Sequence, residues 1–335
     1  MNLAGVDLSV FRFDYDLTFA ALLMNPDGTI YHVFAGRDAE EATSHLTEEN
    51  LVRTLGETLP EHEAYSRNPS PPKAAPPRRI EELPKWAKRA KEGKAPDCFH
   101  CHMVFDAEHE DLVDRKRWDR DLLWRWPDPV QAGLRLRRED PAVVAEVLPG
   151  SAAAAADLKP GDRLLRLGGY RILTFGDVQR ALHEADGGKT RLPVTFDRAG
   201  LEIVGEFRLP KDWKVADPEV FAWRPSKWPL SPKPGFGGPR LGASELRAAG
   251  LPEDAFAMRV GYIVDWGDAA HTGRNAAKAG IRKGDLVLSV AGKDDFTGPD
   301  HLHAWYRLKL KAGMKVPVVV LRGGRRETLQ LPVVE

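Results

Sequence analysis

Two stretches of this 335-residue sequence are built alike: GSAAAAADLKPGDRLLRLGGYRI at 150–172 and GRNAAKAGIRKGDLVLSVAGKDD at 273–295. The second follows the first at a constant offset of 123 residues. Solenoid repeats have periods of roughly 20 to 50 residues, so this longer spacing predicts a duplicated domain. The matching positions are Gly150, Leu158, Gly161, Asp162, Leu165, Gly169 and Asp177, opposite Gly273, Ile281, Gly284, Asp285, Leu288, Gly292 and Asp300.

Both copies continue with the same order of elements. Each has a short amphipathic segment, DVQRALHEA at 177–185 and DHLHAWYRL at 300–308, which predicts a helix. Two strand-like runs then end each copy. The Gly-Asp pair predicts a turn, because glycine accepts a positive φ and aspartate accepts backbone N–H bonds. The repeat therefore predicts two small domains of strands capped by helices.

These residues resemble the HtrA-type PDZ domain of bacteria. Its pattern is an apolar strand, P-G-S-x-A, A-G-L-x-x-G-D, a strand and x-G, and the first copy reads VVAEVLPGSAAAAADLKPGDRLLRLGG at 143–169. Asp157 stands where the pattern usually has glycine, but aspartate tolerates the left-handed region better than most residues. The resemblance implies binding of C-terminal or extended peptides by strand addition.

The resemblance also implies which residues form the two grooves: a loop that receives a peptide carboxylate and a helix opposite it. Pro239 follows the second loop and removes a backbone donor. The alternative is that these side chains only fill the core. The implied peptide-binding residues are Gly133, Leu134, Arg135, Leu136, Val178 and Leu182 in the first copy, and Phe236, Gly237, His301 and Trp305 in the second.

HtrA proteins are serine proteases, but nothing here resembles their protease domain. The sequence has no G-x-S-x-G or G-N-S-G-G stretch, and Ser151 lies inside the PDZ-type turn. No protease triad is therefore visible, and a non-enzymatic chain is favoured. Oxidoreductase chemistry is the one enzyme class left open.

The N-terminal 63 residues predict a hairpin followed by a helix. Two apolar runs flank the turn Asn25-Pro26-Asp27-Gly28, and leucines at 46, 51, 55 and 59 predict a helix over 47–59 with Thr47 as its N-cap. This segment resembles the C-terminal half of a thioredoxin fold. It is similar to bacterial thioredoxin-like/PDZ proteins, some of which are selenoproteins. The redox half is missing, so a truncated start or a degenerate scaffold is expected.

The fold class expected is α+β and multi-domain, with a partial thioredoxin-like α/β N-terminus before two PDZ-type β-barrel or sandwich domains. SRNPSPPKAAPPRR, between 66 and 79, predicts an extended linker. The expected domains are 1–63 (thioredoxin-like half), 64–96 (Pro-rich and basic linker), 97–128 (a small module), 129–211 (first PDZ domain) and 212–335 (linker plus second PDZ domain).

DCFHCHMV, at 97–104, holds the only two cysteines, in a C-x-x-C-H motif. One interpretation is attachment of haem c through Cys98 and Cys101, with His102 as iron ligand and the tryptophans of 85–128 covering the porphyrin. A second is zinc, for which Cys98 and Cys101 supply two thiolates and His102 or His100, together with His109, completes four ligands. A redox dithiol, a structural disulfide and two inert thiols stay open.

Composition narrows the classes of partner. Lysine and arginine number 49, as do aspartate and glutamate, so no basic excess favours nucleic acid. No apolar run approaches the roughly 18 residues of a membrane span. The start lacks a signal-peptide pattern, whereas C-x-x-C-H and the PDZ type favour an exported, periplasmic compartment. A truncated start would reconcile the two.

Two hypotheses follow from the sequence. The first is a peptide- or protein-binding adaptor that uses its PDZ domains and carries haem or a metal on C-x-x-C-H. The second is a thiol redox protein of thioredoxin-like type, whose PDZ domains select its clients.

Overall fold

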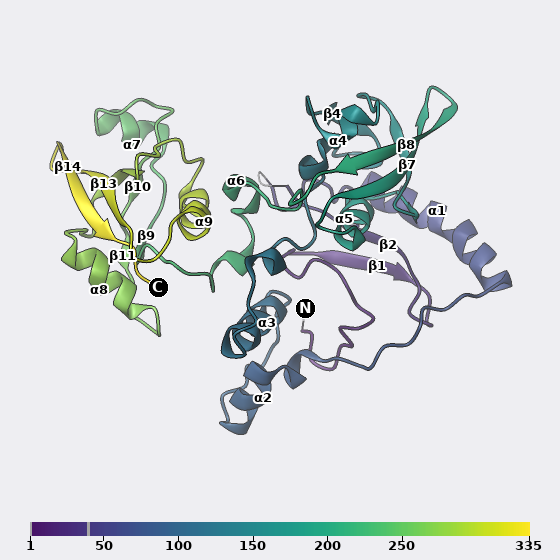
Figure 1. The fold of residues 1–335 in the computed structure, drawn as a ribbon, viewed down its shortest axis with the longest axis horizontal. Helices are drawn as coiled ribbons and strands as arrows, with labels where there is room; N and C mark the ends of the chain where they lie inside the picture. The colour runs from purple at the N-terminus through teal and green to yellow at the C-terminus, as the bar shows by residue number, and fades with distance from the viewer. Residues whose placement is uncertain (1, 39–40) are drawn as a thin grey trace. The chain divides into compact units, whose positions relative to one another are not determined.

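A computed structural model describes residues 2–38 and 41–335 and forms two compact units, Met1–Ala216 and Asp217–Glu335. Each unit mixes helices and antiparallel strands, which confirms a mixed α and β fold (Figure 1). Among the described residues, no helix is both long and apolar enough to cross a bilayer. The finer domain boundaries expected from the sequence stay predictions.

The first repeat copy lies in the first unit as a four-stranded antiparallel sheet, in the order β6-β5-β7-β8, beside a two-stranded sheet β3-β4. Helix α5 packs its apolar face into the core between these sheets. The elements are η3 (Pro129–Ala132), β3 (Leu134–Leu136), β4 (Val144–Val147), α4 (Ala152–Ala155), β5 (Arg163–Leu167), β6 (Tyr170–Arg171), α5 (Phe175–Glu184), β7 (Thr190–Arg198) and β8 (Leu201–Leu209).

The second unit repeats this plan, with a four-stranded sheet β10-β12-β13-β14 and a two-stranded sheet β9-β11. Helix α9 contributes Leu302 and Tyr306 to its core. The elements are α6 (Pro218–Phe221), η4 (Pro225–Lys227), β9 (Phe236–Gly237), α7 (Ala243–Ala248), β10 (Met258–Arg259), β11 (Tyr262–Ile263), α8 (Ala270–Lys278), β12 (Leu286–Val290), α9 (Pro299–Lys309), β13 (Lys315–Arg322) and β14 (Arg325–Pro332).

The N-terminal hairpin is confirmed: β1 (Ala20–Met24) pairs antiparallel with β2 (Ile30–Ala35). Helix α1 (Glu48–Arg67) begins at the predicted N-cap, because the Thr47 hydroxyl accepts the N–H of Asn50 at 3.2 Å. The helix continues past the predicted end through Pro60.

The leucine pattern of α1 does not mark its buried face. Leu55 and Leu59 are exposed, whereas Thr54 and Thr58 are buried. Both hydroxyls donate to the carbonyl four residues earlier, so the buried polar face stays satisfied.

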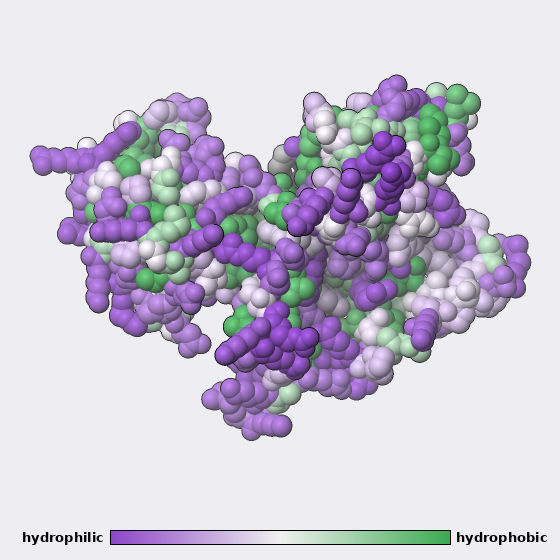
Figure 2. All heavy atoms as spheres, viewed as in Figure 1, coloured by the Kyte–Doolittle hydropathy of each residue, from purple (hydrophilic) through white to green (hydrophobic). Residues whose placement is uncertain are grey.

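Figure 2 shows apolar surface over the β7–β8 hairpin, where the side chains of Leu201 and Val204 are exposed.

The segment between α1 and the first repeat copy is partly helical. Residues 68–79 have no helix or strand, as the proline content predicts, but two short helices follow within the predicted linker. Helix α2 packs on α3, and α3 begins two residues after Cys101. The elements are η1 (Ile80–Glu82), α2 (Pro84–Lys91), α3 (Met103–Asp114) and η2 (Arg120–Leu123).

Strand β2 lies against the outer face of α5, and the buried carboxylate of Asp177 joins them. This carboxylate accepts the backbone N–H of Val33 at 2.9 Å and a bond from His32 Nδ1 at 2.8 Å. Gly176 permits the approach, because a Cβ there would lie 2.3 Å from the Val33 oxygen. The N-terminal segment is thus packed on the first repeat copy.

His32 is fully buried between Asp177 and Glu61. Burial alone would lower the pKa of His32, but its hydrogen bonds to the two carboxylates outweigh burial and raise that pKa to about 9. Because the folded pKa exceeds the ordinary value of 6.5, protonated His32 stabilises the fold fully below about pH 6.5. This contribution is lost as the pH rises through 9.

We expect His32→Gln to remove that pH dependence. Between pH 6.5 and 9.5 the wild-type free energy of unfolding should fall by on the order of 2 kcal/mol more than that of the variant. Urea unfolding across this range measures the difference. His62→Gln, at an exposed histidine of α1, is the matched control and should behave as wild type. Parallel pH profiles for wild type and His32→Gln would contradict the assignment.

Candidate functional site

The first candidate groove lies along β3, one edge of which is paired with β4. The Gly133 carbonyl accepts from Leu148 N–H, and Arg137 N–H donates to Val143 O, both at 2.9 Å. Because bonding direction alternates along a strand, Leu134 and Leu136 direct their N–H and C=O groups away from β4. This geometry leaves backbone donors and acceptors where strand addition needs them.

Four of the predicted groove residues come together below this edge. Leu134, Leu136, Val178 and Leu182 all lie in the core of the first copy and are buried. Arg135, between the two strand leucines, is exposed and pairs with Glu146 of β4 at 3.2 Å. The apolar set therefore forms a floor continuous with the core.

The loop before β3 requires its glycine. Gly133 ends η3 with φ +91° in the left-handed region, and a Cβ there would lie 2.0 Å from that of Ser151. Ser151 is in turn the N-cap of α4 and accepts the Ala154 N–H at 3.1 Å. A side chain at 133 would thus displace both the loop and the start of α4.

The second groove has the same edge geometry. Gly235 O accepts from Val264 N–H and Gly237 O from Gly261 N–H, so Phe236 and Gly238 direct their peptide groups the other way. Pro239, like Gly235 and Gly237, directs its backbone groups toward β10 and β11, since its carbonyl accepts from Arg259 N–H. The missing donor of Pro239 is therefore not on the groove side, contrary to the expectation from the sequence.

Helix α9 lies close to the second loop, with His303 directed at Gly237. A Cβ on Gly237 would lie 2.9 Å from His303 Nε2 and 2.3 Å from the Tyr262 hydroxyl. His303 is buried, and burial together with the neighbouring Arg307 holds the pKa of its imidazole well below the usual range. Phe236 and Trp305, two predicted groove residues, lie in the same core cluster.

A tryptophan-proline pair precedes both loops, and this signal was missed in reading the repeat. Trp126-Pro127 lies seven residues before Gly133, and Trp228-Pro229 lies seven before Gly235. Each tryptophan packs on the helix of its own copy. Trp126 stacks on His183 at 4.4 Å between ring centroids, and the Arg307 guanidinium lies 5.1 Å from the Trp228 ring.

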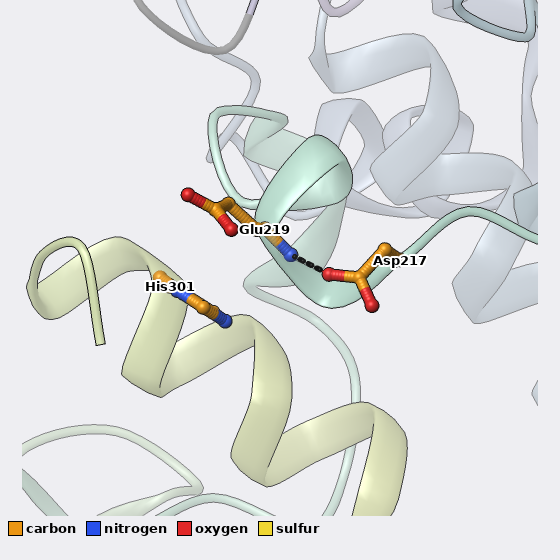
Figure 3. A group of neighbouring side chains, drawn as sticks. All are labelled: Asp217, Glu219 and His301. Atoms are coloured by element: carbon orange, nitrogen blue, oxygen red, sulfur yellow. Dashed lines mark hydrogen bonds between the residues drawn. The ribbon is translucent and has the colours of Figure 1, made fainter. Parts of the chain in front are cut away.

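His301 and Trp305 lie one turn apart on α9, and both pack edge-on against the Phe296 ring, at 5.4 and 5.6 Å between ring centroids. His301 also lies near two carboxylates, those of Asp217 and Glu219 (Figure 3). In the described part of the chain, this is the one group of three or more histidine, cysteine and acidic side chains whose ligand atoms all lie within 4.8 Å of one another.

The C-x-x-C-H residues are dispersed by comparison. Cys98 and Cys101 are both half-buried. His102 Nδ1 lies 3.4 Å from a carboxylate oxygen of Asp106, and that contact raises the pKa of His102 against the effect of its burial. His109 packs edge-on against Trp118, with ring centroids 4.2 Å apart. The structure therefore does not gather Cys98, Cys101, His102 and His109 into one ligand set.

The tryptophans that could cover a porphyrin have other contacts. The indole N–H of Trp86 donates to Met103 O at 3.2 Å, and its ring packs on Phe99. Trp118 and Trp126 pack on histidines. Haem attachment at this motif gains no support from these contacts.

A cavity of about 360 Å³ lies between α1 and the first-copy sheet. Its arginines have acidic partners: Asp140 joins Arg53 and Arg163, and Glu57 pairs with Arg171. Arg166 and Glu202 add one charge of each sign. The four arginines at this cavity thus face three carboxylates, and three of the arginines are engaged in ion pairs.

Comparison with known proteins identifies the first copy. Residues 143–195 match the PDZ domain family model. The chain contains a PDZ domain. The match begins just before β4 and ends within β7, so α5 lies inside the matched region and β3 lies before it.

The curated relatives are similar over short stretches. A predicted zinc metalloprotease of Agrobacterium fabrum is 50% identical over 61 residues, which is 18% of this chain and 16% of that protein. One of Brucella suis is 42% identical over 76 residues, 23% and 19%. Human Rhophilin-1 is 36% identical over 91 residues, 24% and 12%. The chain thus spans less than a fifth of each of these relatives.

Among solved structures, the HtrA-type protease AlgW with a decapeptide is similar, with a TM-score of 0.26 and 16% identity, over 44% of this chain and 50% of that one. The relatives' metalloprotease name finds no matching motif here, because the sequence contains no H-E-x-x-H. The PDZ prediction is confirmed, whereas the thioredoxin-like and selenoprotein resemblance gains no support.

The geometry of Cys101 yields a chemical test. Burial raises the pKa of the Cys101 thiol, which lowers its thiolate fraction at neutral pH. We expect the alkylation rate of Cys101, measured with iodoacetamide in a Cys98→Ser variant, to rise with a midpoint above about pH 8.5. A midpoint below pH 7 would show an activated thiolate and contradict this reading.

Proposed function

We propose that this chain is a peptide-binding adaptor and that its first PDZ domain binds an extended or C-terminal peptide beside β3. The observation that carries the proposal is the edge of β3, where Leu134 and Leu136 direct backbone groups away from β4. The positive-φ Gly133 turns the preceding loop at the start of this edge. PDZ domains bind peptides by adding a strand at such an edge.

The groove specificity proposed is apolar. Leu134, Leu136, Val178 and Leu182 supply the floor, so an aliphatic or aromatic ligand side chain fits there better than a charged one. The Arg135 side chain is exposed on the outer face of β3. It would contact those side chains of the bound peptide that point away from the apolar floor.

The second copy enters the proposal as a related groove. Its loop and strand direct the peptide groups of Phe236 and Gly238 as the first copy does. His303 reaches from α9 to the level of Gly237, where a Cβ would lie 2.9 Å from its Nε2. A peptide bound there would have to displace or contact His303.

The alternative, a thiol redox protein, is not favoured by any described contact. A redox dithiol needs a thiolate of low pKa, whereas burial raises the pKa of Cys101. A haem or zinc on Cys98 and Cys101 stays a prediction from the motif alone.

The proposal predicts a pattern of backbone contacts. A peptide is selected from a C-terminal library, and its backbone nitrogens are methylated one at a time. Methylation at every second residue should weaken binding at least tenfold, and methylation at the residues between them should weaken it less than threefold. The reason is that alternate N–H groups face the strand. Fluorescence anisotropy with the full chain measures this. Equal effects at both parities would contradict strand addition.

Matched glycine variants show which groove binds. Gly133→Ala places a Cβ against Ser151, and Gly235→Ala places one 2.3 Å from Thr272 O. We expect Gly133→Ala to weaken the selected peptide at least tenfold and Gly235→Ala to leave it within twofold. Circular dichroism of both variants checks folding. Loss only in Gly235→Ala would assign the peptide to the second copy.

A further inference from the structure

Three metal-ligating side chains meet where α6 packs on α9: Asp217, Glu219 and His301 (Figure 3). Each offers one ligand atom, and these atoms lie within 4.8 Å of one another. The two carboxylates are exposed and can rotate, whereas the histidine is buried. Around a tetrahedral zinc ion with bonds of about 2.0–2.2 Å the ligand atoms lie roughly 3.3–3.6 Å apart, so rotation of the two exposed side chains has to bring these atoms closer by up to about 1.5 Å.

The local structure fixes how the carboxylates are presented. Asp217 is the N-cap of α6, and one of its oxygens accepts the Glu219 N–H at 2.9 Å (Figure 3). Its other oxygen lies outside that hydrogen bond. Glu219 follows in the first turn, so both carboxylates lie at the start of α6.

His301 is the independent observation that points to a ligand. It is 4% exposed, and Thr297 engages its Nδ1 through the backbone N–H at 3.2 Å and the hydroxyl at 3.1 Å. Within the residues that the structure describes, no hydrogen bond engages Nε2. Figure 3 shows the far edge of the ring directed toward the carboxylates of α6.

We propose that Asp217, Glu219 and His301 bind a zinc ion. One imidazole nitrogen with two carboxylate oxygens is a donor set that zinc takes, whereas calcium and magnesium favour oxygen alone. Three protein ligands leave a fourth position for water. This site is separate from Cys98 and Cys101, which belong to the other unit.

Burial lowers the pKa of His301, whereas the nearby Glu219 and Asp217 act in the opposite direction. The contacts with Thr297 indicate which nitrogen carries the ring proton. In the free chain Nδ1 accepts from Thr297 N–H, and the ring proton is on Nε2. Zinc on Nε2 would move this proton to Nδ1, where Thr297 Oγ1 can accept it, and the bond that Thr297 N–H donates to Nδ1 in the free chain would be given up in exchange.

Zinc would join two elements that lie 84 residues apart in the sequence, since Asp217 begins α6 and His301 lies in the first turn of α9. Helix α9 also borders the second candidate groove. An ion bound only by the folded state stabilises the unit that holds it.

The test uses the full chain with both thiols removed (Cys98→Ser, Cys101→Ser), so that any zinc bound is not held by the cysteines. Zinc is titrated into the chelator-treated protein against a competing fluorescent indicator. Glu219→Gln and His301→Gln are compared with Glu253→Gln, an exposed glutamate of the same unit. Nitrogen-15 NMR of the histidine rings reports which nitrogen of His301 carries the proton.

The proposal predicts one zinc per chain, at least tenfold weaker binding in Glu219→Gln and His301→Gln, and binding within twofold in Glu253→Gln. It also predicts that the His301 proton moves from Nε2 to Nδ1 on zinc addition. If His301→Gln fails to fold, Glu219→Gln and the NMR signal still decide. Unchanged binding in Glu219→Gln, no binding up to about 100 μM zinc, or a His301 ring that keeps its Nε2 proton would overturn the proposal.

Discussion

The buried carboxylate of Asp177 is the contact on which the arrangement of the first unit depends. Its two oxygens accept the N–H groups of Val33, Leu173 and Thr174 as well as a bond from His32. A buried carboxylate is costly unless its charge is paired and its lone pairs are used. Here one side chain caps α5, anchors β2 and faces a protonated imidazole, so the helix and the hairpin are held together.

Helix α5 is consequently held on two sides. Its apolar face packs into the PDZ core, and its outer face meets the N-terminal hairpin. In the second copy, the outer face of α9 has different contacts. Asp300, at the repeat position of Asp177, is exposed and pairs with Lys227 at 3.0 Å. Short helices upstream of the second loop cover that face of α9, in place of a hairpin.

Sequence reasoning found the repeat, the Gly-containing loops and the hairpin, because these depend on local turn chemistry and on spacing. It could not find the His32–Asp177 pair, since 145 residues separate the partners and neither belongs to a motif. The leucines of α1 were misleading because Thr54 and Thr58 lie on its buried face instead, with their hydroxyls bonded to carbonyls of the same helix. The zinc-ligand group was likewise hidden, as Asp217 and Glu219 lie far from His301 in the chain.

The most direct measurement is amide hydrogen exchange of the full chain with and without a selected peptide. The account predicts that Leu134 and Leu136 exchange readily in the free chain, because their N–H groups face away from β4, and become protected when peptide binds. The amides of α5 should stay protected in both states, since the helix is already fixed by Asp177. Protection that appears at another strand edge, with none at β3, would contradict the central claim.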